Sequence, residues 1–196
     1  MRLFRLPASI RASRARPAPA RRRGLLRDEN GAVAIEFGVL ALPFFTLIYA
    51  ILETSIVFLS GQILDAAVND ASRKVRTGQA QTAEWSASTF KTEVCDGLYG
   101  LFDCNGVKVK VSKFTSFQSA APSPPVSEDC DADATEAECA WTIAETYTPG
   151  SGSEIVLVEA YYKWPTLINL PWFNLATQAG GTRLQSAVRV FRNEPF

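Results

Sequence analysis

A long apolar run near the N-terminus limits what this chain can fold into more than any other feature. From Ala32 to Leu59 the chain carries two charged side chains, Glu36 and Glu53. At about 1.5 Å per residue, a helix over Phe37–Leu59 is about 35 Å long, enough to cross the roughly 30 Å hydrocarbon core of a bilayer. A helix buried in a soluble protein is the alternative, but such length is rare there. We predict one transmembrane helix.

The charges around this run are segregated and predict an orientation. The net charge is zero, yet residues 1–27 contain nine arginines and no acidic residue. Because cationic flanks remain in the cytoplasm, we expect residues 1–31 to be a basic cytoplasmic leader and the rest to lie outside. A nucleic-acid-binding arm and an organelle transit peptide are alternatives that we do not favour, because the apolar run follows directly. We therefore expect this chain to bind membrane lipid and not to bind nucleic acid.

Helical periodicity continues beyond the apolar run. Apolar residues recur at spacings of three and four, and charged residues occupy the opposite face. This stripe comprises Ile63, Leu64, Ala67, Val68, Ala71 and Val75. Gly78 is a plausible stop. We predict one helix over residues 32–78, transmembrane at first and amphipathic later, whose stripe packs onto a domain formed by residues 79–196.

The patterns in residues 79–196 predict a small α+β domain. A short helix is expected over Glu84–Val94. Alternation predicts strands over residues 107–112, Ile155–Trp164 and Leu184–Arg192, the second with one apolar face. No crossover helix separates the last two strands, which favours antiparallel pairing. Four aromatic side chains could form a surface for a partner, but we favour a place in the domain core. They are Trp164, Trp172, Phe173 and Phe196.

Four cysteines form two pairs with eight intervening residues, Cys95/Cys104 and Cys130/Cys139. An even count in a domain expected outside the cytoplasm indicates disulfides, for which three connectivities are possible. We favour the two local pairs, because each closes a short polar loop. There is no C-x-x-C motif for redox exchange or zinc.

The composition argues against an enzyme. The chain has no histidine, which excludes imidazole bases, Ser-His-Asp triads and histidine-bound metals. Residues 129–133 resemble the opening of a calcium loop, but Ala134 and Ala140 stand where glycine and glutamate are required. Nothing fixes the separation of the three glutamates that glycosidase chemistry would use. These are Glu145, Glu154 and Glu159. We expect no enzymatic activity, no cofactor and no metal.

Glu36 lies just inside the apolar run, where an ionised carboxylate is costly. A cut between Gly31 and Ala32 would create an α-amino group that is cationic near neutral pH. The amine of a neighbouring subunit could then pair with Glu36 and set the register between helices. The alternative is that Glu36 lies at headgroup level and is solvated. The physics leaves both open.

The segment Gly31-Ala-Val-Ala-Ile-Glu-Phe37, with residues 38–43 after it, resembles the N-terminus of TadE-like pseudopilins. These proteins belong to the tight-adherence (Flp-type, type IV) pilus assembly system of bacteria. Glu53, residues 64–67 and 75–80, and the C-terminal residues 191–196 also resemble the family. The resemblance is strong over residues 31–80 and implies a pilin-like fold.

The resemblance implies that prepilin peptidase cuts between Gly31 and Ala32, that Glu36 is the pilin glutamate and that Phe37 is the aromatic residue after it. Further partners would be other pilins or pseudopilins and the inner-membrane assembly platform, with the C-terminal domain in the periplasm. The size of that domain points to a minor subunit. Pro43 predicts a kink that either serves helix packing in a filament or is neutral. An uncleaved single-pass anchor for a binding or scaffold domain is the alternative.

Overall fold

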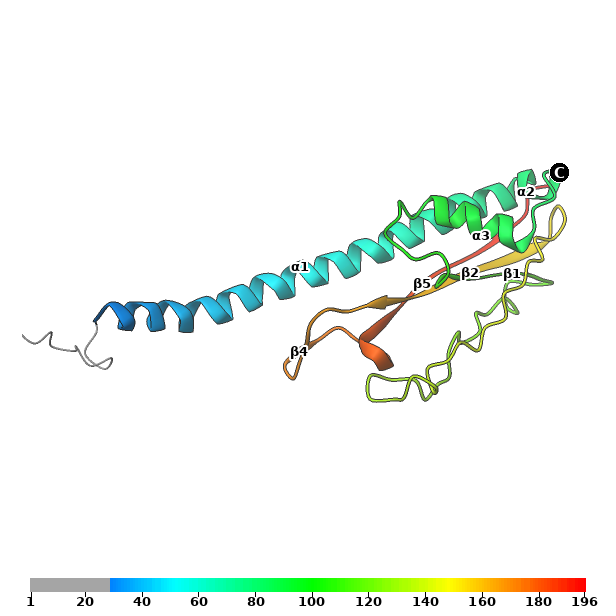
Figure 1. Ribbon diagram of the computed structural model, residues 1–196. Helices are drawn as coiled ribbons and strands as arrows, with labels where there is room; N and C mark the ends of the chain where they lie inside the picture. The colour runs from blue at the N-terminus through cyan, green and yellow to red at the C-terminus, as the bar shows by residue number, and fades with distance from the viewer. Residues whose placement is uncertain (1–28) are drawn as a thin grey trace, which may run out of the picture. The chain divides into compact units, whose positions relative to one another are not determined.

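The computed structural model describes residues 29–196 and shows a long helix followed by a small antiparallel sheet domain, an α+β fold (Figure 1). The helices are α1 (Glu29–Arg76), α2 (Gln79–Thr82) and α3 (Ala87–Asp96), and the strands are β1 (Lys108–Phe114), β2 (Ile155–Pro165), β3 (Asn169–Leu170), β4 (Phe173–Asn174) and β5 (Thr182–Arg192). The chain divides into two compact units between Phe44 and Phe45. The second unit therefore includes the C-terminal part of α1. The predicted leader lies outside the described residues except for residues 29–31.

The helix ends follow from local sequence. Gly78 has a φ of 78°, a left-handed conformation that glycine adopts without a steric penalty, so the predicted stop of α1 is confirmed. The short helix was predicted over Glu84–Val94 but begins later, at Ala87. The reason is that Ser86 caps it, its hydroxyl accepting from Thr89 N at 3.2 Å.

Three antiparallel strands form the main sheet in the order β1-β2-β5, so the predicted antiparallel pairing is confirmed. Val109 of β1 and Ala187 of β5 both pair with Ala160 of β2. The two short strands β3 and β4 form a hairpin that the sequence patterns did not predict. It interrupts the connection between β2 and β5.

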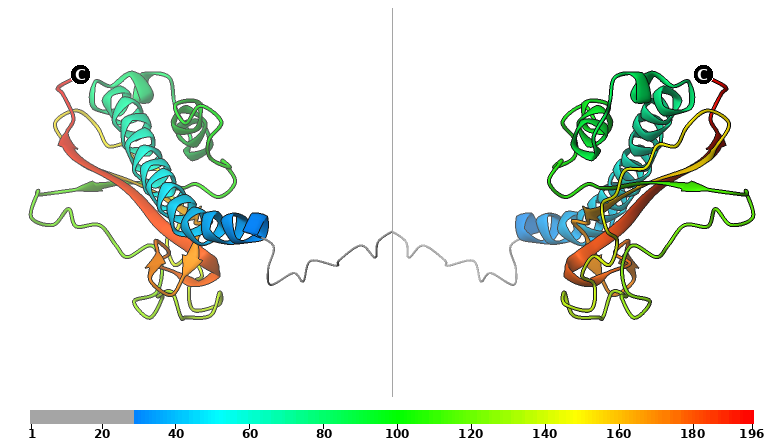
Figure 2. Two further views of the ribbon diagram at one scale, coloured as in Figure 1. Left: turned by 90° about the vertical axis from the view of Figure 1, so that its left-hand side faces the viewer. Right: turned by 90° about the vertical axis from the view of Figure 1, so that its right-hand side faces the viewer.

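The hydrophobic core lies between one face of the sheet and the helices. Figure 2 shows the C-terminal part of α1 and α3 on the same side of the strands. Leu64, Val68 and Val75 of α1 are fully buried, as is Val158 of β2. The predicted packing of the helical stripe onto the domain is therefore confirmed, with Ile63 half-buried at its margin.

The opposite face of β2 is also covered, which the predicted single apolar face did not anticipate. Leu157, Glu159 and Tyr161 are buried there. The long connection between β1 and β2 runs across this face, and Ser123 N donates to Glu159 Oε1 at 3.2 Å. A strand covered on both faces loses the alternation of a half-buried strand.

The prediction that four aromatic residues are core residues is wrong for two of them. Trp164 is half-buried and its ring lies 5.1 Å from that of Phe102. Trp172 is 69% exposed and Phe196 is 56% exposed, whereas Phe173 is half-buried. Trp172 belongs to the hairpin that leaves the main sheet. Phe196 lies over Gly78, where an added Cβ would stand 2.5 Å from its ring.

Candidate functional site

The N-terminal part of α1 is apolar and exposed. Side chains such as Val39, Leu40 and Phe44 are more than half exposed, and the first buried residue is Ala50. By length and composition this helix can cross a membrane. Soluble proteins rarely expose so many neighbouring apolar side chains to water. The helix therefore fits a single-pass membrane anchor.

The residues predicted to act in processing and assembly lie at the start of this anchor. Gly31, Ala32, Glu36 and Phe37 all lie on the first turns of α1 and are exposed. Glu36 forms no ion pair with any of residues 29–196. Pro43 lies inside the helix, which continues through it. The candidate residues thus lie on a stretch of one helix.

Glu53, the other carboxylate of the apolar run, has a different environment. It is 6% exposed, and its Oε1 accepts hydrogen bonds from the backbone N–H groups of Leu167 and of Ile168, the latter at 3.1 Å. These donors precede β3, so the carboxylate caps two amide groups outside the main sheet. The signal that could have revealed this role is a lone charge late in an apolar run, since a buried carboxylate needs donors.

Two further contacts attach α1 to β5. Gln185 Nε2 donates to the carbonyl of Val57 at 3.0 Å and to the hydroxyl of Ser60 at 3.1 Å. Arg189 pairs with Asp65. Periodicity cannot reveal such polar contacts, because they join residues more than a hundred positions apart.

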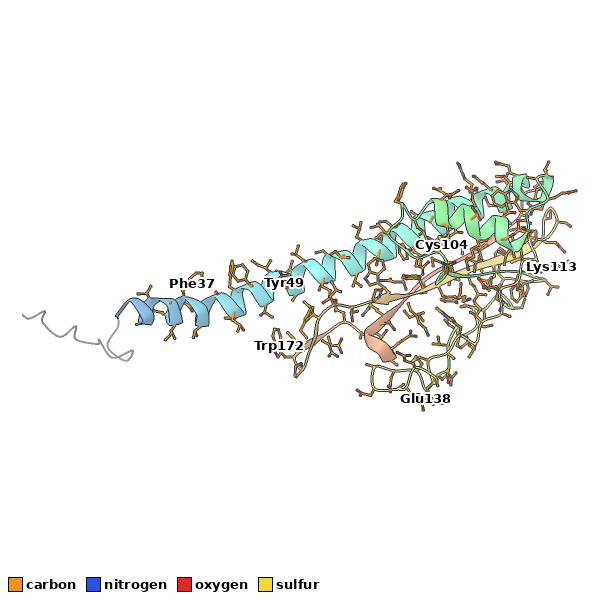
Figure 3. All side chains as sticks on the ribbon, viewed as in Figure 1. Phe37, Tyr49, Cys104, Lys113, Glu138 and Trp172 are labelled. Carbon is orange, nitrogen blue, oxygen red and sulfur yellow. A yellow bond between two sulfur atoms is a disulfide. The ribbon has the colours of Figure 1, made fainter. Side chains whose placement is uncertain are left out.

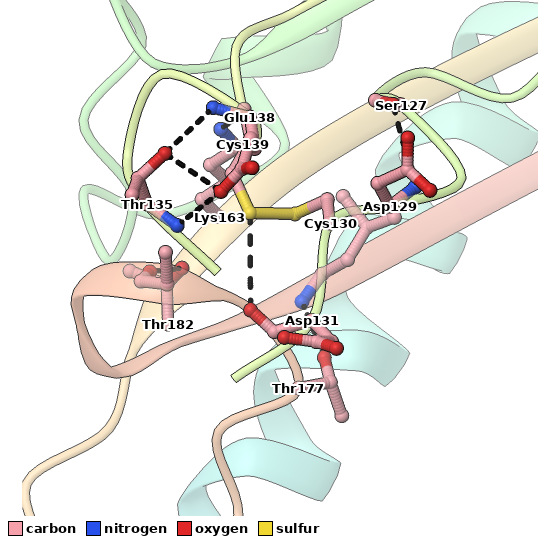
Figure 4. The surroundings of a disulfide bond; sticks show 12 residues. Ser127, Asp129, Cys130, Asp131, Thr135, Glu138, Cys139, Lys163, Thr177 and Thr182 are labelled. Carbon is pink, nitrogen blue, oxygen red and sulfur yellow. Dashed lines mark hydrogen bonds between the residues drawn. A yellow bond between two sulfur atoms is a disulfide. The ribbon is translucent and has the colours of Figure 1, made fainter. Parts of the chain in front are cut away.

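The structure contains both disulfides in the pairing that we favoured. Cys95–Cys104 links the end of α3 to the loop before β1, with Cα atoms 5.9 Å apart. Cys130–Cys139 closes an acidic loop, with Cα atoms 4.7 Å apart (Figure 4). The first bond joins a helix to a loop, and the second closes a loop within the β1–β2 connection.

Carboxylates of the acidic loop accept hydrogen bonds from other residues of the same loop. Glu138 accepts from the backbone N–H and from the hydroxyl of Thr135, both at 2.7 Å, and these bonds lower the pKa of Glu138 (Figure 4). Asp131 Oδ1 accepts from Asp133 N at 2.9 Å. Within residues 29–196 no group of three or more acidic or cysteine side chains is arranged to hold a metal ion.

All three glutamates considered for glycosidase chemistry form ion pairs with lysines, and the two that are not fully buried form the shorter pairs. Glu145 bridges Lys91 and Lys108, each at 3.1 Å. Burial raises the pKa of Glu145. The hydrogen bonds and charges of both lysines lower it, and together they outweigh burial, so the pKa is lowered overall. Glu154 pairs with Lys113 at 3.3 Å. These carboxylates join strands and helices to one another.

The third, Glu159, is fully buried beneath the long β1–β2 connection. Its Oε1 accepts from Tyr161 Oη at 2.9 Å, and Lys110 Nζ lies 3.8 Å from Oε2. Burial, together with the nearby charge of Glu159 and its hydrogen bond, raises the pKa of Tyr161. The phenol therefore stays protonated and remains a donor.

Fold and site together define a single-pass membrane-anchor helix whose C-terminal part is built into a disulfide-containing α+β domain. Comparison with protein families agrees with the resemblance found in the sequence. Residues 31–73 match the family model described as TadE-like protein. This segment is therefore similar to TadE-like proteins. No curated protein matches the chain. No solved structure matches it either.

Proposed function

We propose that this protein is a minor pseudopilin, or pilus assembly subunit, of a tight-adherence pilus. It acts as a structural subunit and not as a catalyst. Prepilin peptidase removes the basic leader between Gly31 and Ala32, and the mature chain assembles with other pilins or pseudopilins through its N-terminal helix. The N-terminus lies in the cytoplasm, α1 crosses the inner membrane, and the domain lies in the periplasm. Partnership with the assembly platform, and entry into the filament, belong to this proposal.

The observation that carries the proposal is the contrast between the two carboxylates of the apolar run. Glu53 receives two backbone donors from its own domain. Glu36 is exposed and has no ion-pair partner among residues 29–196. A carboxylate in an apolar setting requires a partner or becomes neutral. Glu36 is therefore available to a group supplied by another molecule.

Leader removal supplies a suitable group. The α-amine of Ala32 has an ordinary pKa of about 7.7–8.0, so much of it is cationic at neutral pH. Ala32 lies on the first turns of α1, where backbone N–H groups have no partner within the helix. One ion pair per subunit would then fix the axial register. Contacts among exposed apolar side chains supply the remaining association.

The experiment compares Glu36→Gln with Glu128→Gln, the same chemical change at an exposed carboxylate of the β1–β2 connection. We expect Glu36→Gln to leave membrane insertion intact but to remove the subunit from the purified pilus fraction. Glu128→Gln should remain in that fraction. Normal recovery of Glu36→Gln with the pili would refute the assembly role of this carboxylate.

Mass spectrometry of the membrane form tests the processing step separately. A chain that begins at Ala32, and that is absent in a strain without the peptidase, is the expected result. An intact arginine-rich N-terminus would instead support an uncleaved anchor for a binding or scaffold domain.

A further inference from the structure

The connection between β2 and β5 is unusual for a water-exposed surface. Residues 165–181, which we call the β3–β4 segment, contain no charged side chain. Leu167 is 86% exposed and Trp172 is 69% exposed. The segment also contains Ile168, Leu170, Phe173 and Leu175, which are half-buried. Large apolar side chains that gather on one exposed loop indicate an interaction surface.

This segment is attached to α1 at a defined point. Glu53 accepts from the backbone N–H groups of Leu167 and Ile168, and the carboxylate is 6% exposed. Within the second compact unit, Figure 3 shows Trp172 at the end where Tyr49 lies on the exposed apolar part of α1. Residues Ile51 and Leu52, directly before Glu53, are also more than half exposed. The apolar surfaces of helix and segment thus occupy the same end of this unit.

The length of the helix places Glu53 at a membrane boundary. At about 1.5 Å per residue, Ala32–Leu52 is about 31 Å long, close to the roughly 30 Å hydrocarbon core. The sequence alone also allowed a span as far as Leu59. That span would carry the Glu53 carboxylate and the irregular backbone around Leu167 into hydrocarbon, where lipid-exposed loops do not occur. The span therefore ends before Glu53.

We propose that the β3–β4 segment is a second membrane contact, which seats Leu167 and Trp172 in the interfacial layer of the bilayer that α1 crosses. The inference rests on the membrane anchoring proposed above. Tryptophan favours this layer, because its ring is apolar and its N–H can still meet water or headgroups. With no charge in the segment, insertion removes no ion from water.

Lipid is the occupant because this surface continues the surface of the span. The exposed apolar side chains of α1 lie on both sides of Glu53, as far as Leu59, and those of the segment begin at the residues bound to Glu53. A neighbouring subunit is the other conceivable occupant, and the experiment separates the two. Two attachment points would restrict rotation and tilt of the domain on the membrane.

Depth-resolved quenching by brominated lipids tests the proposal on the full chain reconstituted into phosphatidylcholine vesicles at low protein density. Bromine near the headgroup end of the acyl chains should quench part of the tryptophan emission. Trp172→Phe should abolish that component, and Trp85→Phe, a change on the half-buried Trp85 that packs against the core, should retain it. Equal quenching in the two variants, or none in the wild type, would overturn the proposal.

A second variant keeps Trp172 as the fluorescent reporter and changes Leu167, the other side chain proposed to enter the interfacial layer. Leu167→Ser should reduce quenching of Trp172 at least twofold, whereas Leu101→Ser, an exposed leucine outside the segment, should not. Unchanged quenching in Leu167→Ser would count against the seating of this side chain.

Vesicle flotation, measured first, separates the two levels of the argument. A chain that does not float with the vesicles overturns the membrane anchor, and the inference falls with it. A chain that floats while Trp172 stays unquenched overturns the inference alone. Emission of Trp172 that stays unquenched and shifts with protein density would assign the surface to a neighbouring subunit and not to lipid.

Discussion

Replacing Leu64 by alanine should destabilise the second compact unit strongly, because this residue of the membrane-anchor helix is a core residue of the domain. Leu64 is fully buried against β1 and β2 residues. Losing three carbon groups at about 0.8 kcal/mol each removes about 2.4 kcal/mol of transfer free energy. The cavity left behind raises the cost to about 3–4 kcal/mol, within the range of buried leucine-to-alanine changes.

The matched control is Leu59→Ala, a leucine of the same helix that is 56% exposed. A substitution on an exposed face should change the free energy of unfolding by about 0.5 kcal/mol or less. Guanidinium unfolding of the full chain in detergent micelles, followed by tryptophan fluorescence, measures both variants. Equal destabilisation of Leu64→Ala and Leu59→Ala would refute the division of this part of α1 into a buried face and an exposed face.

Two further predictions concern the domain alone. Glu145→Gln should reduce stability at pH 7 by about 0.5–1 kcal/mol, since the partly exposed pairs with Lys91 and Lys108 are lost. Because the pKa of Glu145 is lowered on folding, its contribution is present above the ordinary glutamate pKa of about 4.3 and disappears as the pH falls through the lowered value. Unfolding curves for wild type and variant should therefore converge in acid, and a constant difference would contradict this. Replacing Cys130 and Cys139 together by alanine should destabilise the acidic loop by about 2–3 kcal/mol, the value expected for closing a loop of this length; unchanged proteolysis of the loop in the variant would contradict this.

The end of α1 lies against the C-terminal residues of the domain. Gly78 and Phe196 are more than a hundred residues apart in the sequence. They meet in the fold, and Glu194 N donates to the carbonyl of Arg76 at 2.9 Å. The C-terminal residues thus cap the end of α1. The spacing of residues along the chain could not show that these two stretches touch.

Periodicity in the sequence was sufficient to predict the long helix, its buried stripe, the three strands and their antiparallel arrangement. These features depend on local spacing of apolar residues, which a strand or helix converts directly into a face. The short loops between paired cysteines likewise favoured the local disulfides. The processing and assembly residues Gly31, Ala32, Glu36 and Phe37, and the role of Pro43, remain predictions, because they depend on molecules outside this chain.

The sequence by itself determined that the chain has an apolar anchor, a basic flank and an α+β body, because composition and period act locally along the chain. Only the tertiary structure decided how Glu53 is accommodated in this helix. The sequence shows Glu53 only as a charged residue in an apolar run. Its buried carboxylate accepts a hydrogen bond from Leu167, which is more than a hundred residues away. A buried carboxylate is stable only where donors converge on it, and convergence of distant segments is a property of the fold.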